Sequence, residues 1–208
     1  MLSVDSLTEL LLKSPTMLVL IFCSILVVTF ALERWLYFMR TRYSANEFKA
    51  TMRKHLARNQ LGEFAKYCQR GSGSLGRIMG AGLDNLSAGR DQVDQLLDTE
   101  MEKEQVLMER NLIVLGTLAN IAPLLGLFGT VVGIIRAFKD IAVTGSGGSS
   151  VIAMGVSEAL LTTAAGIVVA VIATVFYNAF TRTIRVRNTE AEDARNMFWK
   201  YVNSRPVE

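Results

Sequence analysis

The chain has 208 residues, of which 50% are hydrophobic and 20% charged, and its formal net charge is +3. This apolar content excludes a disordered chain, which is poor in apolar residues and rich in charge. Two cysteines without a CxxC spacing exclude a disulfide framework, and a single histidine excludes a His-rich metal centre. The modest net charge gives no reason to expect a nucleic-acid partner.

Three long runs of the sequence carry no charge. They cover residues 14–32, 111–135 and 159–181 and are 19, 25 and 23 residues long. A helix rises about 1.5 Å per residue, so the runs reach roughly 28–38 Å, enough to cross a bilayer core of about 30 Å. Buried helices of a large soluble protein are the alternative, but 208 residues cannot wrap three of them. We therefore predict an all-α integral membrane protein with transmembrane helices at 15–38, 111–138 and 151–181.

The first run also has the length of a signal peptide, which would be removed. Against this, Ser14-Pro15 is typical of a helix start, with proline at the first helical position. Glu33-Arg34 stands where a small-residue cleavage site would be, and the aromatic residues that follow are typical of a membrane interface. We predict a retained membrane helix.

The distribution of Lys and Arg predicts the orientation, because cytoplasmic segments carry the excess of positive charge. Residues 34–110 hold thirteen and the tail from Arg182 holds six, whereas the N-terminal segment holds one and the connection 136–150 holds two. We expect an outer amphipathic segment at 1–14, a cytoplasmic helical loop at 39–110, an outer hairpin at 139–150 and a cytoplasmic tail at 182–208.

Helical periodicity continues outside the predicted spans. Residues 43–69 and 75–86 have apolar residues at helical spacing, separated by a Gly/Ser-rich break at 71–74. No Gly or Pro separates a further helix from the second span, which predicts one continuous helix from about Asp91 to Phe138. The segment 182–202 should continue the third span. Two of the three membrane helices would thus extend into the cytoplasm.

Small residues form one face of each of the last two spans. In the second span they recur in alternating steps of three and four residues: Gly116, Ala119, Pro123, Gly126, Thr130, Gly133 and Ala137. The third span has a similar stripe: Ala159, Thr163, Gly166, Ala170, Ala173 and Tyr177. Such faces normally serve close helix packing. The alternative is that they line a narrow cavity in an oligomer, where Thr130 and Thr163 hydrogen-bond water or a partner carboxyl.

Pro123 adds a local feature to the second span. It lacks an N–H, so the carbonyl of Ala119 loses its helical partner and should face protein or water. Asn120 is close enough in sequence to help. A simple helix kink is the alternative reading, and both can hold.

Glu158 is the only ionisable residue of the third apolar segment if that segment begins near Val151. An intramembrane carboxylate is by default a functional candidate. However, Glu158 lies about 140° around the helix from Thr163. Reaching the interface, or pairing with Arg136 or Lys139, is an equally weighted alternative.

Two segments resemble motifs of the MotA/TolQ/ExbB proton-channel family. The segment Asn120–Ile134 (NIAPLLGLFGTVVGI) is similar to the family signature, and Ser157–Gly166 (SEALLTTAAG) resembles its third-span motif. Tyr177-Asn178 matches the family's exit into the cytoplasm. Three spans and a long first loop resemble the ExbB and TolQ branch rather than the four-span flagellar stators. Val131-Val132 departs from the Val-Trp of familiar members.

The resemblance implies a ring of subunits, typically five, in a bacterial inner membrane with the N-terminus periplasmic and the C-terminus cytoplasmic. The ring would surround the single transmembrane helices of two ExbD- or TolR-like partners, whose membrane aspartate takes up and releases protons. It implies no cofactor and an output through a TonB- or TolA-like transducer. The family's two pore threonines correspond to Thr130 and Thr163, and its third-span glutamate corresponds to Glu158. The small stripes would then face the pore.

Two functions remain in competition. One is a motor subunit driven by the proton motive force; the other is a passive membrane scaffold that only assembles single-span partners. We reject an enzyme as the third hypothesis because the sequence has no nucleophile–base set, no metal cluster and no phosphate loop. Threonines on small-residue stripes favour the motor.

Overall fold

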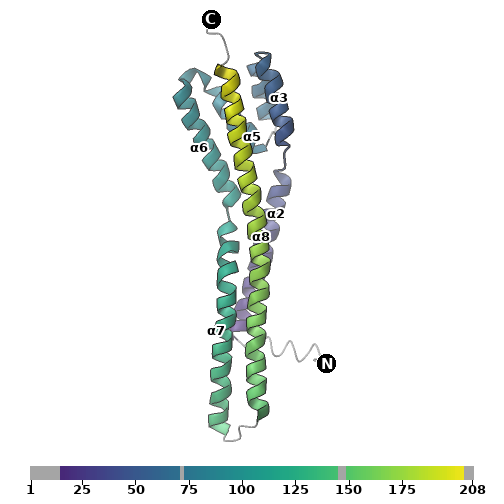
Figure 1. The fold of residues 1–208 in the computed structure, drawn as a ribbon, viewed down its shortest axis with the longest axis vertical. Helices are drawn as coiled ribbons and strands as arrows, with labels where there is room; N and C mark the ends of the chain where they lie inside the picture. Colours follow the sequence, from purple (N-terminus) through teal and green to yellow (C-terminus); the bar gives the residue numbers. More distant parts are fainter. Residues whose placement is uncertain (1–14, 71–72, 145–148, 204–208) are drawn as a thin grey trace. The chain divides into compact units, whose positions relative to one another are not determined.

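A computed structural model describes residues 15–70, 73–144 and 149–203 of the chain. Throughout these residues the regular structure is helical (Figure 1). The elements are α2 (Pro15–Arg40), α3 (Ala45–Ala57), α4 (Leu61–Gln69), α5 (Gly73–Asp84), the 3-10 turn η1 (Leu86–Ala88), α6 (Arg90–Glu109), α7 (Leu112–Thr144) and α8 (Ser149–Asn203). The predicted amphipathic segment 1–14 lies outside the described residues.

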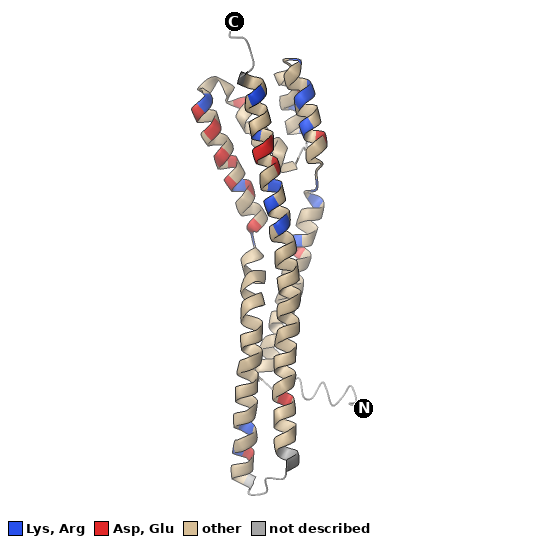
Figure 2. Cartoon of the chain, viewed as in Figure 1, with Lys and Arg blue, Asp and Glu red and all other residues tan. Residues whose placement is uncertain are grey.

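Three helices are long and apolar enough to cross a membrane, and they begin at Pro15, Leu112 and Ile152. Figure 2 shows that charged residues gather on α3, α6 and the later part of α8, while most of α7 and the preceding part of α8 carry few. The prediction of an all-α protein with three membrane-spanning helices is confirmed. Assembly into a ring stays a prediction.

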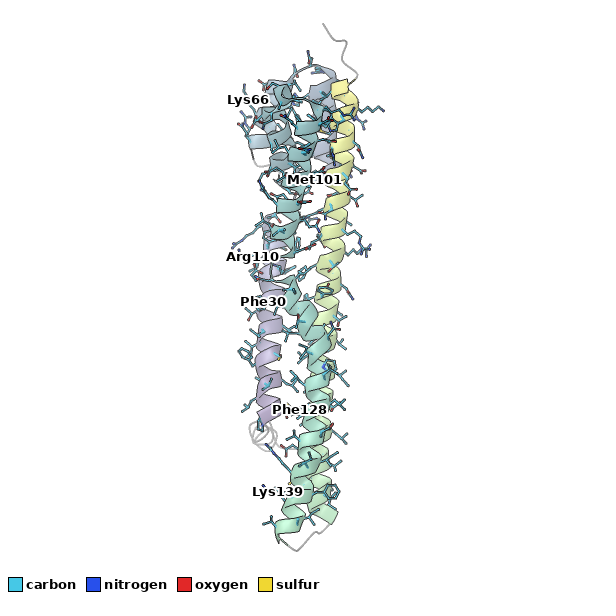
Figure 3. The ribbon with its side chains drawn as sticks, turned by 90° about the vertical axis from the view of Figure 1, so that its left-hand side faces the viewer. Phe30, Lys66, Met101, Arg110, Phe128 and Lys139 are labelled. Atoms are coloured by element: carbon cyan, nitrogen blue, oxygen red, sulfur yellow. The ribbon has the colours of Figure 1, made fainter. Side chains whose placement is uncertain are left out.

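The chain divides into two compact units. The apolar unit combines the residues up to Arg34 with Asn111–Ala179. Large apolar side chains are exposed on it, among them Phe22, Leu124 and Phe128, the last of which is 58% exposed and labelled in Figure 3. An outward-facing apolar surface of this extent is expected where the surroundings are lipid.

The charged unit combines Trp35–Arg110 with the residues from Phe180 onward. Its core contains fully buried side chains from α3, α4, α5, α6 and α8: Phe48, Phe64, Leu75, Leu97 and Phe198. At the edge of this core, Arg195 on α8 donates to Asp94 at 2.7 Å and to Asp98 at 2.5 Å, and Trp199 Nε1 donates to Asp94 at 2.8 Å. The hydrogen bond from Arg195, helped by that from Trp199, lowers the pKa of Asp94.

The prediction of one continuous helix from Asp91 to Phe138 is wrong. Helix α6 ends at Glu109 and α7 begins at Leu112, with Arg110 at the break (Figure 3). Asn111 has a φ of 63°, the left-handed conformation that ends a helix and that Asn tolerates better than most residues. Asn59, with a φ of 54°, interrupts the predicted 43–69 helix in the same way. The continuation of the third span is confirmed, because α8 runs on to Asn203.

Candidate functional site: the seam between α7 and α8

Helices α7 and α8 pack so closely that glycine is required at their contact points. A Cβ added to Gly126 would lie 2.9 Å from Thr163 Cα, and one added to Gly166 would lie 2.5 Å from the Ala122 carbonyl oxygen. A Cβ on Gly133 would lie 2.8 Å from Ala159 Cβ. Rising numbers on α7 meet falling numbers on α8, so the helices are antiparallel. We refer to this glycine-lined contact as the seam.

Most of the predicted small residues lie in or beside the seam. Four alanines of the stripes are buried: Ala137, Ala159, Ala170 and Ala173. The other members on α7 are half-buried at its edge: Gly116, Ala119, Pro123 and Thr130. In one chain the stripes therefore serve helix packing, the first of the two readings. That any of these residues lines a pore in an assembly stays a prediction.

The hydroxyl of Thr163 ties the two helices together. Its Oγ1 donates to the carbonyl of Gly126 across the seam at 2.9 Å, which leaves its lone pairs available as acceptors. Thr130 Oγ1 instead donates within its own helix, to the Leu127 carbonyl at 2.6 Å. Counted one residue for one, the contact of Gly126 with Thr163 puts Thr130 opposite residue 159, and the contact of Gly133 with Ala159 puts it opposite residue 162. The two threonines therefore differ in depth by about 2–6 Å.

Thr162 is a seam residue that the sequence reasoning missed. It is 2% exposed, and its Oγ1 donates to the Ala159 carbonyl at 2.6 Å. A Cβ on Gly129 would lie 2.5 Å from this hydroxyl and 3.1 Å from Thr16 Oγ1, so α2 meets α7 and α8 here. The sequence pattern that could have pointed to this contact is the GxxxG formed by Gly129 and Gly133. It predicts a close helix contact, but it is common.

A polar groove borders the seam near the start of α7. It has a volume of about 400 Å³ and is lined by residues that include Ala119, Asn120, Thr174 and Tyr177. Asn120 was expected to help satisfy the Ala119 carbonyl left by Pro123, but its side chain donates to the Gly116 carbonyl at 2.9 Å. Ala119 itself borders the groove, so water rather than Asn120 can reach the carbonyl that Pro123 leaves without a helical donor.

Glu158 lies near the other end of the seam. It borders a cavity of about 170 Å³ together with Arg136, Asp140 and Thr162. No salt bridge within 4 Å joins Glu158 to Arg136 or Lys139, all three of which the structure describes. It precedes Thr162 by four residues, so it lies about 6 Å beyond the level at which α2 meets the seam. Neither Thr130 nor Thr163 lines this cavity.

Over residues 112–135 of α7 and 159–181 of α8 the seam offers hydroxyls and carbonyls but no carboxylate, because neither range carries a charged residue. Threonine hydroxyls do not ionise near neutral pH, yet each can donate one hydrogen bond and accept two. The arrangement can therefore orient water or a carboxyl group supplied by another chain. It cannot relay a proton by its own side-chain ionisation.

Comparison with known proteins connects this seam to one family. The sequence model of the MotA/TolQ/ExbB proton channel family matches residues 71–193, which include α7 and most of α8. The biopolymer transport protein ExbB of Pseudomonas putida is 47% identical over 81 residues, covering 39% of this chain and 25% of that protein. A putative ExbB-like protein of Synechocystis is 31% identical over 175 residues, covering 80% of this chain and 67% of its own length. ExbB of Salmonella typhimurium is 50% identical over 70 residues, covering 34% of this chain and 29% of that protein.

Proposed function

The chain belongs to the MotA/TolQ/ExbB proton channel family, and from that premise we propose that it is the proton-channel subunit of an ExbB–ExbD or TolQ–TolR type motor. Subunits form a ring, with five as the expected number, in the bacterial inner membrane. The ring encloses an ExbD- or TolR-like single-span protein that carries a membrane aspartate. The proton motive force moves this partner, which acts on the outer membrane through a TonB- or TolA-like transducer.

The observation that carries the proposal is the pair of threonine hydroxyls that lie within about 6 Å of each other in depth. Thr163 already donates to Gly126, so toward a partner it acts as an acceptor from a protonated aspartic acid. Thr130 can exchange its local bond to Leu127 for a bond to the ionised aspartate. Different hydroxyls would then hold the two protonation states of one carboxyl. One charge crossing 100 mV releases about 2.3 kcal/mol, enough to bias such an exchange.

The orientation of the chain is part of the proposal. The Lys and Arg excess on residues 34–110 and on the tail supports a cytoplasmic charged unit, a periplasmic N-terminus and a periplasmic hairpin at 139–150. Glu158 then lies toward the periplasmic end, at the proton entry. The other small residues of the stripes support the close helix packing that a narrow pore requires.

The second candidate function is a passive scaffold for single-span partners. One observation favours it: within the chain, the glycines and Thr163 are used to pack α7 against α8. A scaffold predicts that a variant which assembles normally also functions normally. The two candidates therefore separate on variants that keep the shape of the seam but lose its hydroxyls.

The test is proton uptake by proteoliposomes that contain this chain and its ExbD- or TolR-like partner, driven by a potassium diffusion potential. The double variant Thr130→Val plus Thr163→Val keeps two β-branched residues of similar volume. We expect assembly to survive and uptake to fall by about tenfold or more, with each single change nearly as severe because both act on one step.

The matched control is Thr29→Val in α2. Its hydroxyl donates to the Ile25 carbonyl at 2.8 Å, a local bond like that of Thr130, but it is exposed and distant from the seam in sequence. This variant should retain full uptake. Unchanged uptake by the double variant, at equal amounts of assembled complex, would exclude the channel role of the threonines and favour the scaffold.

A further inference from the structure

The charged unit contains a cavity of about 540 Å³ at the end of the first membrane helix. This volume falls within the range of about 300–1,000 Å³ that is usual for ligand sites. The walls come from the last residue of α2, the C-terminal end of α4 and one face of α5. None of the residues that line it belongs to α7 or α8.

One face of α5 carries two opposite charges, Arg77 and Asp84, with only small residues between them. Residues from Gly73 to Asp84 at helical spacing of three and four line the cavity, with Arg77 near the middle of this face and Asp84 at its end. Between them the lining residues are Gly80 and Ala81, so little side chain fills the space. Arg77 and Asp84 are seven residues apart, about 10 Å along the helix axis. The residues of α5 that lie between the two charged side chains therefore leave the space between them open.

Arg77 is held in a fixed orientation. Its Nε donates to Glu104 Oε1 at 2.6 Å and its Nη2 donates to Glu104 Oε2 at 2.6 Å. Glu104 is buried, whereas the side chain of Arg77 is 55% exposed. This bidentate pair uses one edge of the guanidinium and leaves the N–H groups of Nη1 for a ligand. The hydrogen bonds from Glu104 also raise the pKa of Arg77, which keeps it charged.

Arg40 supplies the second cation and locates the cavity relative to the bilayer. Helix α2 begins at Pro15, so about 20 residues cross the bilayer core and reach Trp35. Arg40 follows five residues later, about 7–8 Å beyond, which is the thickness of a headgroup layer. The cavity that Arg40 lines is therefore within reach of lipid headgroups.

The charge balance of the cavity distinguishes between possible headgroups. Arg40 and Arg77 contribute two positive charges, while Asp84 and the Glu104 that pairs with Arg77 contribute two negative charges. The formal sum is zero, with the two signs at separate places. A simple anion would gain little from such a site, because Asp84 opposes it. A group that carries a phosphate and an ammonium a few ångströms apart matches both signs.

We propose that this cavity binds the headgroup of an aminophospholipid, with its phosphate at Arg40 and Arg77 and its primary ammonium at Asp84. The acyl chains remain in the leaflet at the Trp35 end of α2. A primary ammonium donates three hydrogen bonds, so the site should discriminate against a trimethylated headgroup, which donates none. The bound lipid would fix the end of the first membrane helix to α5.

The experiment is native mass spectrometry of the full-length protein, purified in mild detergent and equilibrated with defined phospholipids. Phosphatidylethanolamine should be retained about five- to tenfold more than phosphatidylglycerol or phosphatidylcholine of the same acyl composition. Arg40→Gln should lower retention of all three lipids. Asp84→Asn should abolish the preference for phosphatidylethanolamine over phosphatidylglycerol.

The matched control is Arg42→Gln, since Arg42 is an exposed arginine two residues from Arg40 that does not line the cavity. It should leave lipid retention unchanged. Displacement of the lipid by millimolar inorganic phosphate would overturn the assignment to a lipid in favour of a free phosphate. Equal retention of the three lipids, or an Arg42→Gln effect equal to that of Arg40→Gln, would overturn the site itself.

Discussion

Replacing Gly166 by alanine tests the seam directly. The new methyl would lie 2.5 Å from the Ala122 carbonyl oxygen and 3.1 Å from Gly126 Cα, both of which are backbone atoms that cannot rotate away. Ordinary contact begins at 3.4 Å, so α7 and α8 must separate by about 0.9 Å. The bond from Thr163 to Gly126, now 2.9 Å, would stretch beyond hydrogen-bonding range.

The expected cost follows from these two effects. Overpacking a tight contact costs about 1–3 kcal/mol, and a lost hydrogen bond between membrane helices adds about 0.6 kcal/mol. We therefore expect Gly166→Ala to reduce the free energy of unfolding by about 2–3 kcal/mol. The assay is reversible unfolding in mixed micelles, followed by steric trapping or by loss of helicity on titration with a denaturing detergent.

Two controls separate packing from the general effect of a methyl group. Ala164→Val adds bulk on α8 two residues away, where Ala164 lines an apolar groove of about 400 Å³ and is exposed. Gly62→Ala makes the same substitution at a helical position with no atom within 4 Å of the new Cβ. Both should remain within about 1 kcal/mol of the unmodified protein. A Gly166→Ala protein as stable as these controls would refute the close approach of the two helices.

The remaining predictions concern topology, assembly and pH. A cysteine that replaces Val143, which is 77% exposed, should react with an impermeant thiol reagent from the periplasm. Labelling only after lysis would contradict the orientation. The native Cys23 and Cys68 are buried and should add little background labelling. Native mass spectrometry should show a closed oligomer, and monomers alone under conditions that preserve activity would contradict the ring. The folded-state pKa of Asp94 is lowered, so its stabilising effect is present above its unfolded pKa of about 3.9 and is lost as pH falls through the lower folded value. Asp94→Asn should therefore flatten the stability profile below about pH 4, and an unchanged acid limb would exclude this contribution.

The membrane helices were predictable because lipid imposes a long uncharged run, a signal that needs no tertiary information. The helix breaks near Asn59 and Asn111 were not predictable from the sequence. A Gly/Ser-rich segment marks the beginning of α5, but Asn111 and Asn59 end helices by adopting a positive φ, and asparagine in sequence is compatible with a helix interior. Choosing the left-handed conformation depends on the packing of the residues on either side, which periodicity does not report.

The candidate site was predictable as two faces but not as a contact. The steps of three and four residues locate Gly126, Gly133 and Gly166 on the right faces, because helical geometry alone determines a face. Which hydroxyl bonds across the seam depends on the register of α7 against α8. Thr162 and Thr163 are adjacent, so the sequence alone does not say which of them faces α7. The structure buries the first and gives the second the bond to Gly126.

The charges around the end of the seam have a consequence for membrane insertion. Between Arg136 and Glu158 the sequence has two basic and two acidic residues: Arg136, Lys139, Asp140 and Glu158. In the proposed orientation this segment must be carried outward across a membrane that is positive outside. Moving one net positive charge in that direction costs about 2.3 kcal/mol per 100 mV, but the segment has a net charge of zero. The helical hairpin can therefore insert without electrical work against the potential that the finished channel is proposed to use.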